Sequence, residues 1–300
     1  MQILADIPRG YPGESAVAWD GYKQITPYLL ELDAVSSDDA GVRKVWWQAA
    51  IAASASGDYE TSLALATAAH EQWKESDEAR WMTSQIGLIH IYLGKPEKGI
   101  PYLEDAHTRH RRHVSNSIAD RLRSNALFDR IGLAKSAAGE AEQALTIHRR
   151  ARYYAQQLSI EYPDNEDAVR EVYRTGGNIA AQLLIMGDYE DALSWSKEAA
   201  NGNEAICGED HRFTHNAKVI YGQALRMNDL LPEAIDVLTR TAEGLVRITG
   251  ESHHDSQKAL SELRIAIDLF ESSGNTLAPS KLTPEISRAL GRIVCEPPEV

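Results

Sequence analysis

Gly57-Asp58-Tyr59-Glu60 and Gly187-Asp188-Tyr189-Glu190 are two copies of one short segment, set between stretches rich in Ala, Leu, Glu and Arg. Those four residue types favour helix. A turn residue followed five positions later by a small residue recurs at Gly57 and Ser62, Gly94 and Gly99, Gly139 and Ala144, Gly187 and Ala192, and Asp229 and Ala234. The turn residues are 37, 45, 48 and 42 positions apart. Periods of this length predict a solenoid of paired helices.

The residues around each turn follow the same register. An apolar residue and a small one stand eight and seven positions before the turn, as in Ile86-Gly87 and Ile131-Gly132. Small residues recur twelve positions after it, at Ala69, Ala106, Ala151, Ala199 and Thr241. Small side chains let two helices approach closely, and large ones fill the grooves between turns. We therefore expect close-packed helical hairpins, with Gly supplying the turn backbone and the following aromatic packing back on the hairpin.

This pattern resembles the tetratricopeptide repeat family over roughly residues 37 to 274. The resemblance implies an all-α fold, a right-handed superhelix (α-solenoid) of about five helical hairpins with flanking cap helices. We expect a lead segment and helix in 1–36, the repeat array and its capping helix in 37–274, and a tail with a short helix in 275–300. The lead helix is expected at about Ala16 to Leu32, the capping helix at Ser256 to Ser272 and the tail helix at Ile286 to Val294.

The C-terminal units carry a second repeated segment. Gly208-Glu209-Asp210-His211 and Gly250-Glu251-Ser252-His253 lie 42 residues apart, which resembles the kinesin-light-chain-like subclass of these repeats. We expect each Gly to end one helix, and Asp210 or Ser252 to cap the next.

A third, looser resemblance rests on the order of several segments along the chain. These are Met1 to Asp6, Trp19 with Tyr22, Pro27-Tyr28-Leu29-Leu30, Gly57 to Glu60, and Glu104-Asp105 followed by Arg109 and Arg111-Arg112. The arrangement resembles the C-terminal repeat (sensor) region of bacterial NB-ARC/tetratricopeptide proteins, a branch of the STAND signalling ATPases. It departs from that family in having Pro27-Tyr28 where the family has Pro-His.

The STAND resemblance implies a sensor that binds a ligand and biases a nucleotide switch. The Gly-Glu-Asp-His segment, however, is missing between the first four units. The chain also contains no Gly-x-x-x-x-Gly-Lys-Ser/Thr phosphate loop, and Gly94-Lys95-Pro96 is the nearest fragment. An NTPase switch module would therefore be a partner that this sequence does not encode.

Composition excludes several classes of function. The net charge of −13 repels phosphate backbones, so we expect no nucleic-acid partner. Cys207 and Cys295 are far apart and without metal-ligand spacing, which fits a reducing cytoplasm. No apolar stretch is long enough to span a membrane, and the N-terminus lacks the features of a signal peptide.

Histidine clusters are the main candidates for chemistry. His107, His110 and His113 alternate with arginines, and we interpret them as a solvated helix end; a docking patch for an acidic partner and a metal site are the alternatives. The group His253-His254-Asp255 and the pair His211 and His215 are expected to cap or pack. No catalytic motif is present, so we expect no enzyme, no cofactor and no metal.

The first helix of each hairpin lines the concave face in the tetratricopeptide fold, and the repeat register predicts which residues face that groove. The predicted partner-binding residues are Trp47, Ile51, Trp81, Leu88, Ile91, Arg174, Asn178, Gln223 and Arg226. Asp129 is the one acid at a groove position. Asn178 stands where peptide-binding light-chain relatives place an Asn, whereas the clamp of chaperone-binding relatives is mismatched. Trp47 and Trp81 could instead contact the lead helix or an upstream domain.

These observations favour a non-catalytic scaffold that recognises a protein or peptide ligand, as the sensor region of a STAND-type signalling protein. A stand-alone adapter that assembles two proteins is the alternative. An enzyme with an unrecognised groove site is a remote one, because a cluster of titratable groups is its expected mark.

Overall fold

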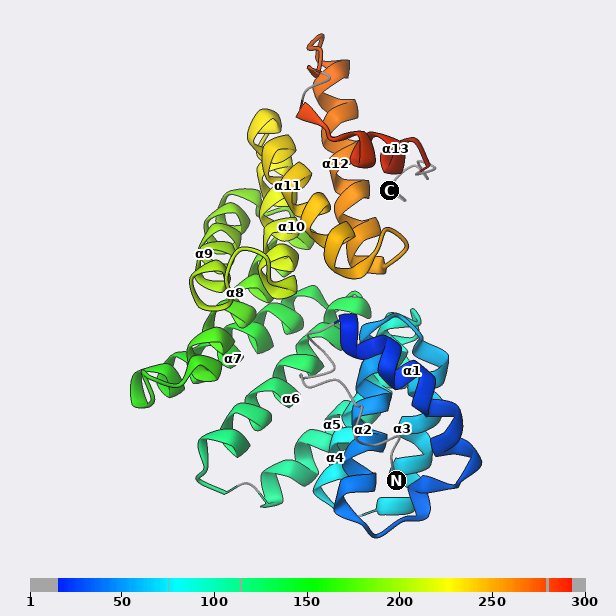
Figure 1. The fold of residues 1–300 in the computed structure, drawn as a ribbon. Helices are drawn as coiled ribbons and strands as arrows, with labels where there is room; N and C mark the ends of the chain where they lie inside the picture. Colours follow the sequence, from blue (N-terminus) through cyan, green and yellow to red (C-terminus); the bar gives the residue numbers. More distant parts are fainter. Residues whose placement is uncertain (1–15, 75, 114, 279–280, 293–300) are drawn as a thin grey trace. The chain divides into compact units, whose positions relative to one another are not determined.

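The computed structural model describes residues 16–74, 76–113, 115–278 and 281–292. The Met1 to Asp6 segment, Cys295 and the end of the predicted tail helix at Val294 lie outside them. The described residues form α-helices joined by short turns, and none of them is in a strand (Figure 1). None of the described helices is both long enough and apolar enough to cross a membrane.

The helices follow one another along the chain with few residues between them. In chain order they are α1 (Ala16–Glu31), α2 (Ala40–Ala55), α3 (Tyr59–Trp73), α4 (Asp77–Tyr92), α5 (Pro96–His113), α6 (Ile118–Ala137), α7 (Ala141–Glu161), α8 (Glu166–Met186), α9 (Tyr189–Cys207), α10 (Arg212–Met227), α11 (Leu231–Thr249), α12 (His254–Ser272) and α13 (Pro284–Arg292), with a 3-10 turn η2 (Ala34–Ser36) after α1. The predicted all-α fold of five hairpins, α2–α3 through α10–α11, is confirmed. The lead and capping helices are present as α1 and α12, and a short tail helix as α13.

The chain divides into two compact units, which meet within α7 between Tyr154 and Ala155. Consecutive helices such as α4 and α5, or α8 and α9, pack together, and so do the first helices of neighbouring hairpins: α2 with α4 and α4 with α6 in one unit, α8 with α10 and α10 with α12 in the other. The first helices of each unit therefore form one layer and the second helices another.

All five hairpins turn in the same way. Gly57, Gly94, Gly139 and Gly187 have φ between 68° and 86°, and Asp229 has φ of 58°, so every predicted turn residue is in the left-handed region. The residue after each turn donates its N–H to the carbonyl five positions earlier, as from Asp58 to Ala53 (2.8 Å) and from Leu230 to Leu225 (3.0 Å). This is the Schellman end of a helix. In α3 and α9 the same residue, Asp58 or Asp188, then caps the second helix.

The aromatic after the Gly-Asp turn does not fold back only on its own hairpin. The ring of Tyr59 lies 5.2 Å from that of Tyr92, at the end of the first helix of the next hairpin. The carbonyl of Tyr189 accepts a hydrogen bond from Asn228 (2.7 Å), at the turn of the next hairpin. The aromatic position therefore joins one turn to the next.

Small residues occupy the helix crossings, as predicted. Ser62, Ala144, Ala192 and Ala234 have no exposed surface. The tightest crossing joins α4 to α5, where a Cβ placed on Gly99 would lie 2.5 Å from the carbonyl oxygen of Gly87. Because the obstructing atom belongs to the backbone, rotation of a side chain cannot relieve the contact.

Two clusters of large side chains complete the cores. In the first unit, Trp46 donates its indole N–H to the carbonyl of Leu65, and Trp73 donates to that of Val35, both at 2.9 Å. In the second unit, leucines of α11 and α12, among them Leu238 and Leu260, are fully buried against α13. Trp46 and Trp73 are therefore buried with their indole N–H groups hydrogen-bonded.

Replacement of Gly99 by Ala is expected to destabilise the fold by about 1–3 kcal/mol, because the added methyl forces α4 and α5 apart. Thermal unfolding by circular dichroism measures this as a lower Tm. Gly291→Ala is the matched control, since no atom lies within 4 Å of the added Cβ. If Gly99→Ala unfolds at the wild-type temperature, the close crossing is wrong.

Candidate functional site

The apolar part of the predicted groove lies on α2 and α4. Trp47 and Trp81 are half-buried and pack against the core cluster that includes residues of α1. Leu88 is 9% exposed, and Ile51 and Ile91 are half-buried. The guanidinium of Arg130, on α6, lies 5.3 Å from the ring centroid of Trp81 and donates a hydrogen bond to Ser84. The two tryptophans are therefore core-packed on one side and partly exposed.

The polar part lies on α8 and α10, and its arginines are already paired. Arg174 donates from Nε and Nη2 to the two carboxylate oxygens of Glu171, at 2.7 and 2.6 Å. Arg226 donates from the same two nitrogens to Oε2 of Glu262 on α12, at 3.1 and 2.9 Å. The side chains of Arg226 and Glu262 are each only 13% exposed. Arg226 therefore ties α10 to α12.

The other two predicted polar residues, Asn178 and Gln223, are half-buried on α8 and α10. The spacing of Glu171 and Arg174, three residues apart on one helix, could have been read from the sequence. The pairing of Arg226 with Glu262 could not, because 36 residues separate them.

The groove position predicted for Asp129 is wrong. Asp129 is fully buried and bonds Nδ1 of His148, on α7, at 2.6 Å. The imidazole of His148 packs against Gly132, where a Cβ would lie 2.6 Å from the ring. A Gly on α6 thus leaves room for an Asp–His pair that joins the two helices of this hairpin.

His107 and His110 are packed rather than solvated, so that interpretation is also wrong. His107 is half-buried, with its ring 5.4 Å from that of Phe128 on α6. His110 is buried, with Nε2 3.0 Å from the carbonyl oxygen of Asp120. Burial, together with the nearby charges of Arg111, His110 and Arg150, lowers the pKa of His107 to about 4. The side chain of His113 lies outside the described residues.

Histidine rather than Asp210 or Ser252 caps the helices after Gly208 and Gly250. Nδ1 of His211 accepts the backbone N–H of Phe213 at 3.2 Å, and Nδ1 of His253 accepts that of Asp255 at 3.1 Å. The two glycines end α9 and α11 as predicted. A ring nitrogen takes the role that a short oxygen-bearing side chain usually has at this position.

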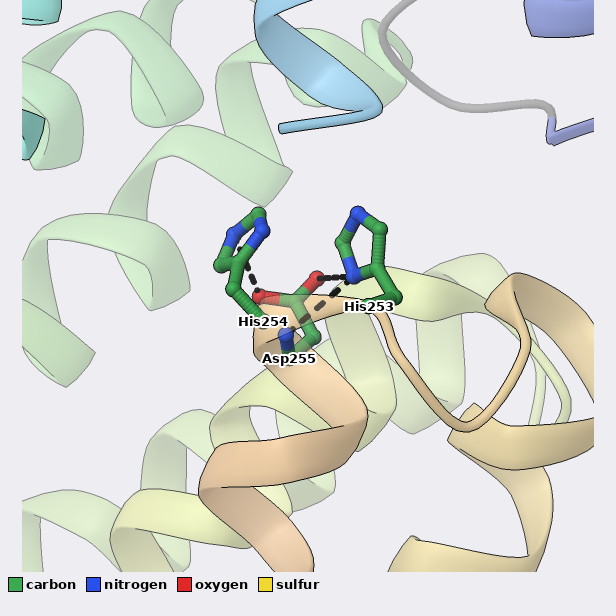
Figure 2. A group of neighbouring side chains, drawn as sticks. All are labelled: His253, His254 and Asp255. Atoms are coloured by element: carbon green, nitrogen blue, oxygen red, sulfur yellow. Dashed lines mark hydrogen bonds and ion pairs between the residues drawn. The ribbon is translucent and has the colours of Figure 1, made fainter. Parts of the chain in front are cut away.

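Among the described residues, His253, His254 and Asp255 form a group of possible metal ligands whose ligand atoms all lie within 4.8 Å of one another (Figure 2). The Asp255 carboxylate lies between the two imidazoles, with Oδ1 3.0 Å from Nε2 of His254. Its Oδ2 accepts hydrogen bonds from Arg212 Nε at 2.6 Å and Asn216 Nδ2 at 3.2 Å.

These ligand atoms are already in use. The guanidinium of Arg212 occupies the position of a cation, and the Nδ1 lone pair of His253 accepts a backbone N–H. Burial by itself would raise the pKa of Asp255, but the His254 hydrogen bond and the Arg212 charge hold that pKa well below its usual value. The arrangement fits a structural link between α10 and α12 better than a metal site.

Comparison with known proteins identifies one repeat directly. Residues 175–212, from α8 through α9 to the start of α10, match the family model described as tetratricopeptide repeat. This match confirms the tetratricopeptide resemblance for that unit. Among curated proteins, none matches the sequence.

Solved structures extend the likeness to most of the chain. A Rap protein complexed with Competence and Sporulation Factor has a TM-score of 0.62 and 14% identity over 91% of this chain and 72% of its own. A STAND protein with a tetratricopeptide repeat sensor from Pyrococcus horikoshii has a TM-score of 0.55 and 12% identity, over 91% of this chain and 43% of its own. Tetratricopeptide-like repeats from Podosopora anserina, titled for kinesin light chain, have a TM-score of only 0.48 with 15% identity, over 70% and 90%. At such identities the first two establish the fold alone.

Replacement of Asp255 by Asn is expected to cost about 3–5 kcal/mol, because it removes the carboxylate that pairs with the buried guanidinium of Arg212. Asp236→Asn is the matched control: its partner Lys281 is half exposed, and such pairs contribute about 0–1 kcal/mol. Urea unfolding measures both.

The same pair of variants has a pH signature. Since the folded pKa of Asp255 is depressed, its contribution is complete above the unfolded pKa of about 3.9 and is lost as pH falls through the folded value. The stability difference between wild type and Asp255→Asn should therefore shrink below about pH 4. A difference that stays constant from pH 7 to pH 3 would contradict the ion pair.

Proposed function

We propose that this chain is a non-catalytic recognition scaffold, which binds a protein or peptide segment against the first helices of its hairpins. The observation that carries the proposal is the half-buried pair Trp47 and Trp81, on the neighbouring helices α2 and α4. Partly exposed tryptophans on a rigid layer are typical anchors at protein interfaces. Arg130 over the Trp81 ring orients that side chain and supplies a charged rim.

Arg174 and Arg226 are each already paired with a glutamate of this chain, which makes the polar part of the predicted groove the weaker candidate for ligand binding. A ligand carboxylate at Arg226 has to compete with Glu262, which already accepts two hydrogen bonds. The apolar half, with Trp47, Ile51, Trp81, Leu88 and Ile91, is therefore the proposed primary site. The polar residues Arg174, Asn178, Gln223 and Arg226, on α8 and α10, are proposed as a secondary site within the second unit that binds the backbone of such a ligand.

A more specific role is the sensor region of a STAND-type signalling protein in the bacterial cytoplasm. The likeness to the repeat-sensor protein of Pyrococcus horikoshii supports this role, and this chain spans less than half of that protein. Ligand binding would then bias a nucleotide switch carried by a separate module, by stabilising one arrangement of the repeats. A stand-alone adapter remains the alternative function.

Trp81→Ala is expected to weaken binding of peptides selected from a displayed random library about thirtyfold, as an interface tryptophan contributes about 2 kcal/mol. Fluorescence anisotropy with the full chain measures the dissociation constant. Trp81→Phe, which keeps an apolar ring, should retain most of the affinity.

Ile160→Ala is the control for this experiment. Ile160 is 74% exposed on α7, a second helix, so its loss should leave both binding and the circular dichroism spectrum unchanged. If Trp81→Ala and Trp47→Ala both bind normally and Arg111→Glu abolishes binding, recognition does not use the first helices.

A further inference from the structure

Positive charge is concentrated in one part of this acidic chain. Residues 106–154 hold ten Lys or Arg and four Asp or Glu, a net charge of +6. Since the whole chain carries −13, the remaining residues carry −19. The segment includes the C-terminal end of α5, all of α6 and the part of α7 that belongs to the first unit.

The charges converge on one surface because α5 and α7 both contact Phe128 of α6. Its ring lies 5.4 Å from that of His107 on α5 and 5.6 Å from the guanidinium of Arg150 on α7. Arg111 is one helical turn beyond His107, and both Arg111 and Arg150 act electrostatically on that imidazole. Arg112 and Arg149 are their exposed sequence neighbours.

Two exposed tyrosines extend the surface along α7. Tyr153 is 57% exposed and Tyr154 is 43% exposed, and their ring centroids are 5.9 Å apart. Arg150 donates to the Tyr154 hydroxyl at 3.2 Å. We call this surface the basic ridge; it consists of Arg111, Arg150, Tyr153 and Tyr154.

The ridge charges are not neutralised within the described part of the chain. Neighbouring arginines do have acidic partners: Arg109 pairs with Asp105 at 2.9 Å and Arg123 with Asp120 at 3.5 Å. In the described residues, no acidic side chain pairs with Arg111 or Arg150, nor with their exposed neighbours Arg112 and Arg149. Like charges held together without a counter-charge repel one another, and a bound anion would relieve that repulsion.

We propose that the basic ridge docks a short acidic segment of a partner protein. Arginine and tyrosine are, with tryptophan, the residue types enriched at interface hot spots, and the ridge consists of arginines and tyrosines. An extended nucleic acid is disfavoured because its phosphates would also meet the acidic remainder of the chain. A short peptide contacts the ridge alone. This surface lies on second helices and does not depend on the groove proposed above.

The probe for this proposal is a labelled peptide of about eight residues, mostly glutamate with two leucines, and fluorescence anisotropy measures its binding to the full chain. Reversal of two ridge charges, Arg111→Glu with Arg150→Glu, is expected to weaken binding at least about tenfold. The control is Lys197→Glu with Lys258→Glu, two exposed positions on α9 and α12. It changes the net charge equally and should bind like wild type.

A second measurement needs no variant. Because the attraction joins opposite charges on exposed side chains, salt should screen it, so the dissociation constant of the peptide should rise steeply as the NaCl concentration is raised from about 50 mM to about 500 mM. Equal weakening by both double variants, or a dissociation constant that does not change with salt, would overturn the proposal. If a labelled single-stranded oligonucleotide binds more tightly than the peptide, and the same ridge variant loses that binding, the partner of the ridge is a nucleic acid and not an acidic peptide.

Discussion

The left-handed turn at the tip of each hairpin is the constraint on which the rest of this structure depends. A positive φ at one residue ends the first helix there. The N–H groups of the turn then donate hydrogen bonds to the last carbonyls of that helix. The second helix then starts at a fixed angle, so that the small residue five positions later falls at the crossing. Asp229 adopts the same conformation without being glycine, which shows that the fold requires the backbone geometry rather than the residue type.

Much of the fold could be predicted because turn and crossing are encoded locally. Gly187 and Ala192, for example, are five residues apart, and both have the structural role that this spacing predicts. The residues that cap the helices were harder to predict. Ser252 is the usual residue type for a cap, yet the ring nitrogen of the neighbouring His253 accepts the backbone N–H. The proposed division of the chain at residues 36 and 274 remains a prediction.

The candidate site could be predicted only in part, because side-chain pairing depends on contacts between helices. Asp129 lies at a groove position in the repeat register, yet His148 on the next helix holds it in the interior. Arg226 likewise lies at a groove position, but it donates its hydrogen bonds to Glu262 of the same chain. The repeat register predicts which helix carries a residue, but not whether a neighbouring repeat already supplies its partner.

Electrostatics distinguishes the two units of the chain. The second unit pairs charges between its first helices, as Arg212 does with Asp255, and these pairs link successive repeats. The ridge of the first unit leaves its arginines without acidic partners in the described residues. The two tryptophans and the ridge also lie on different helices of that unit, which is compatible with two separate partners.

The most direct test of recognition by the first helices is a crystal structure of the full chain with a selected peptide that contains no acidic residues. Peptide density against Trp47 and Trp81, along α2 and α4, is the expected result. Density confined to the second helices, with both tryptophans unchanged and uncontacted, would contradict the proposed site.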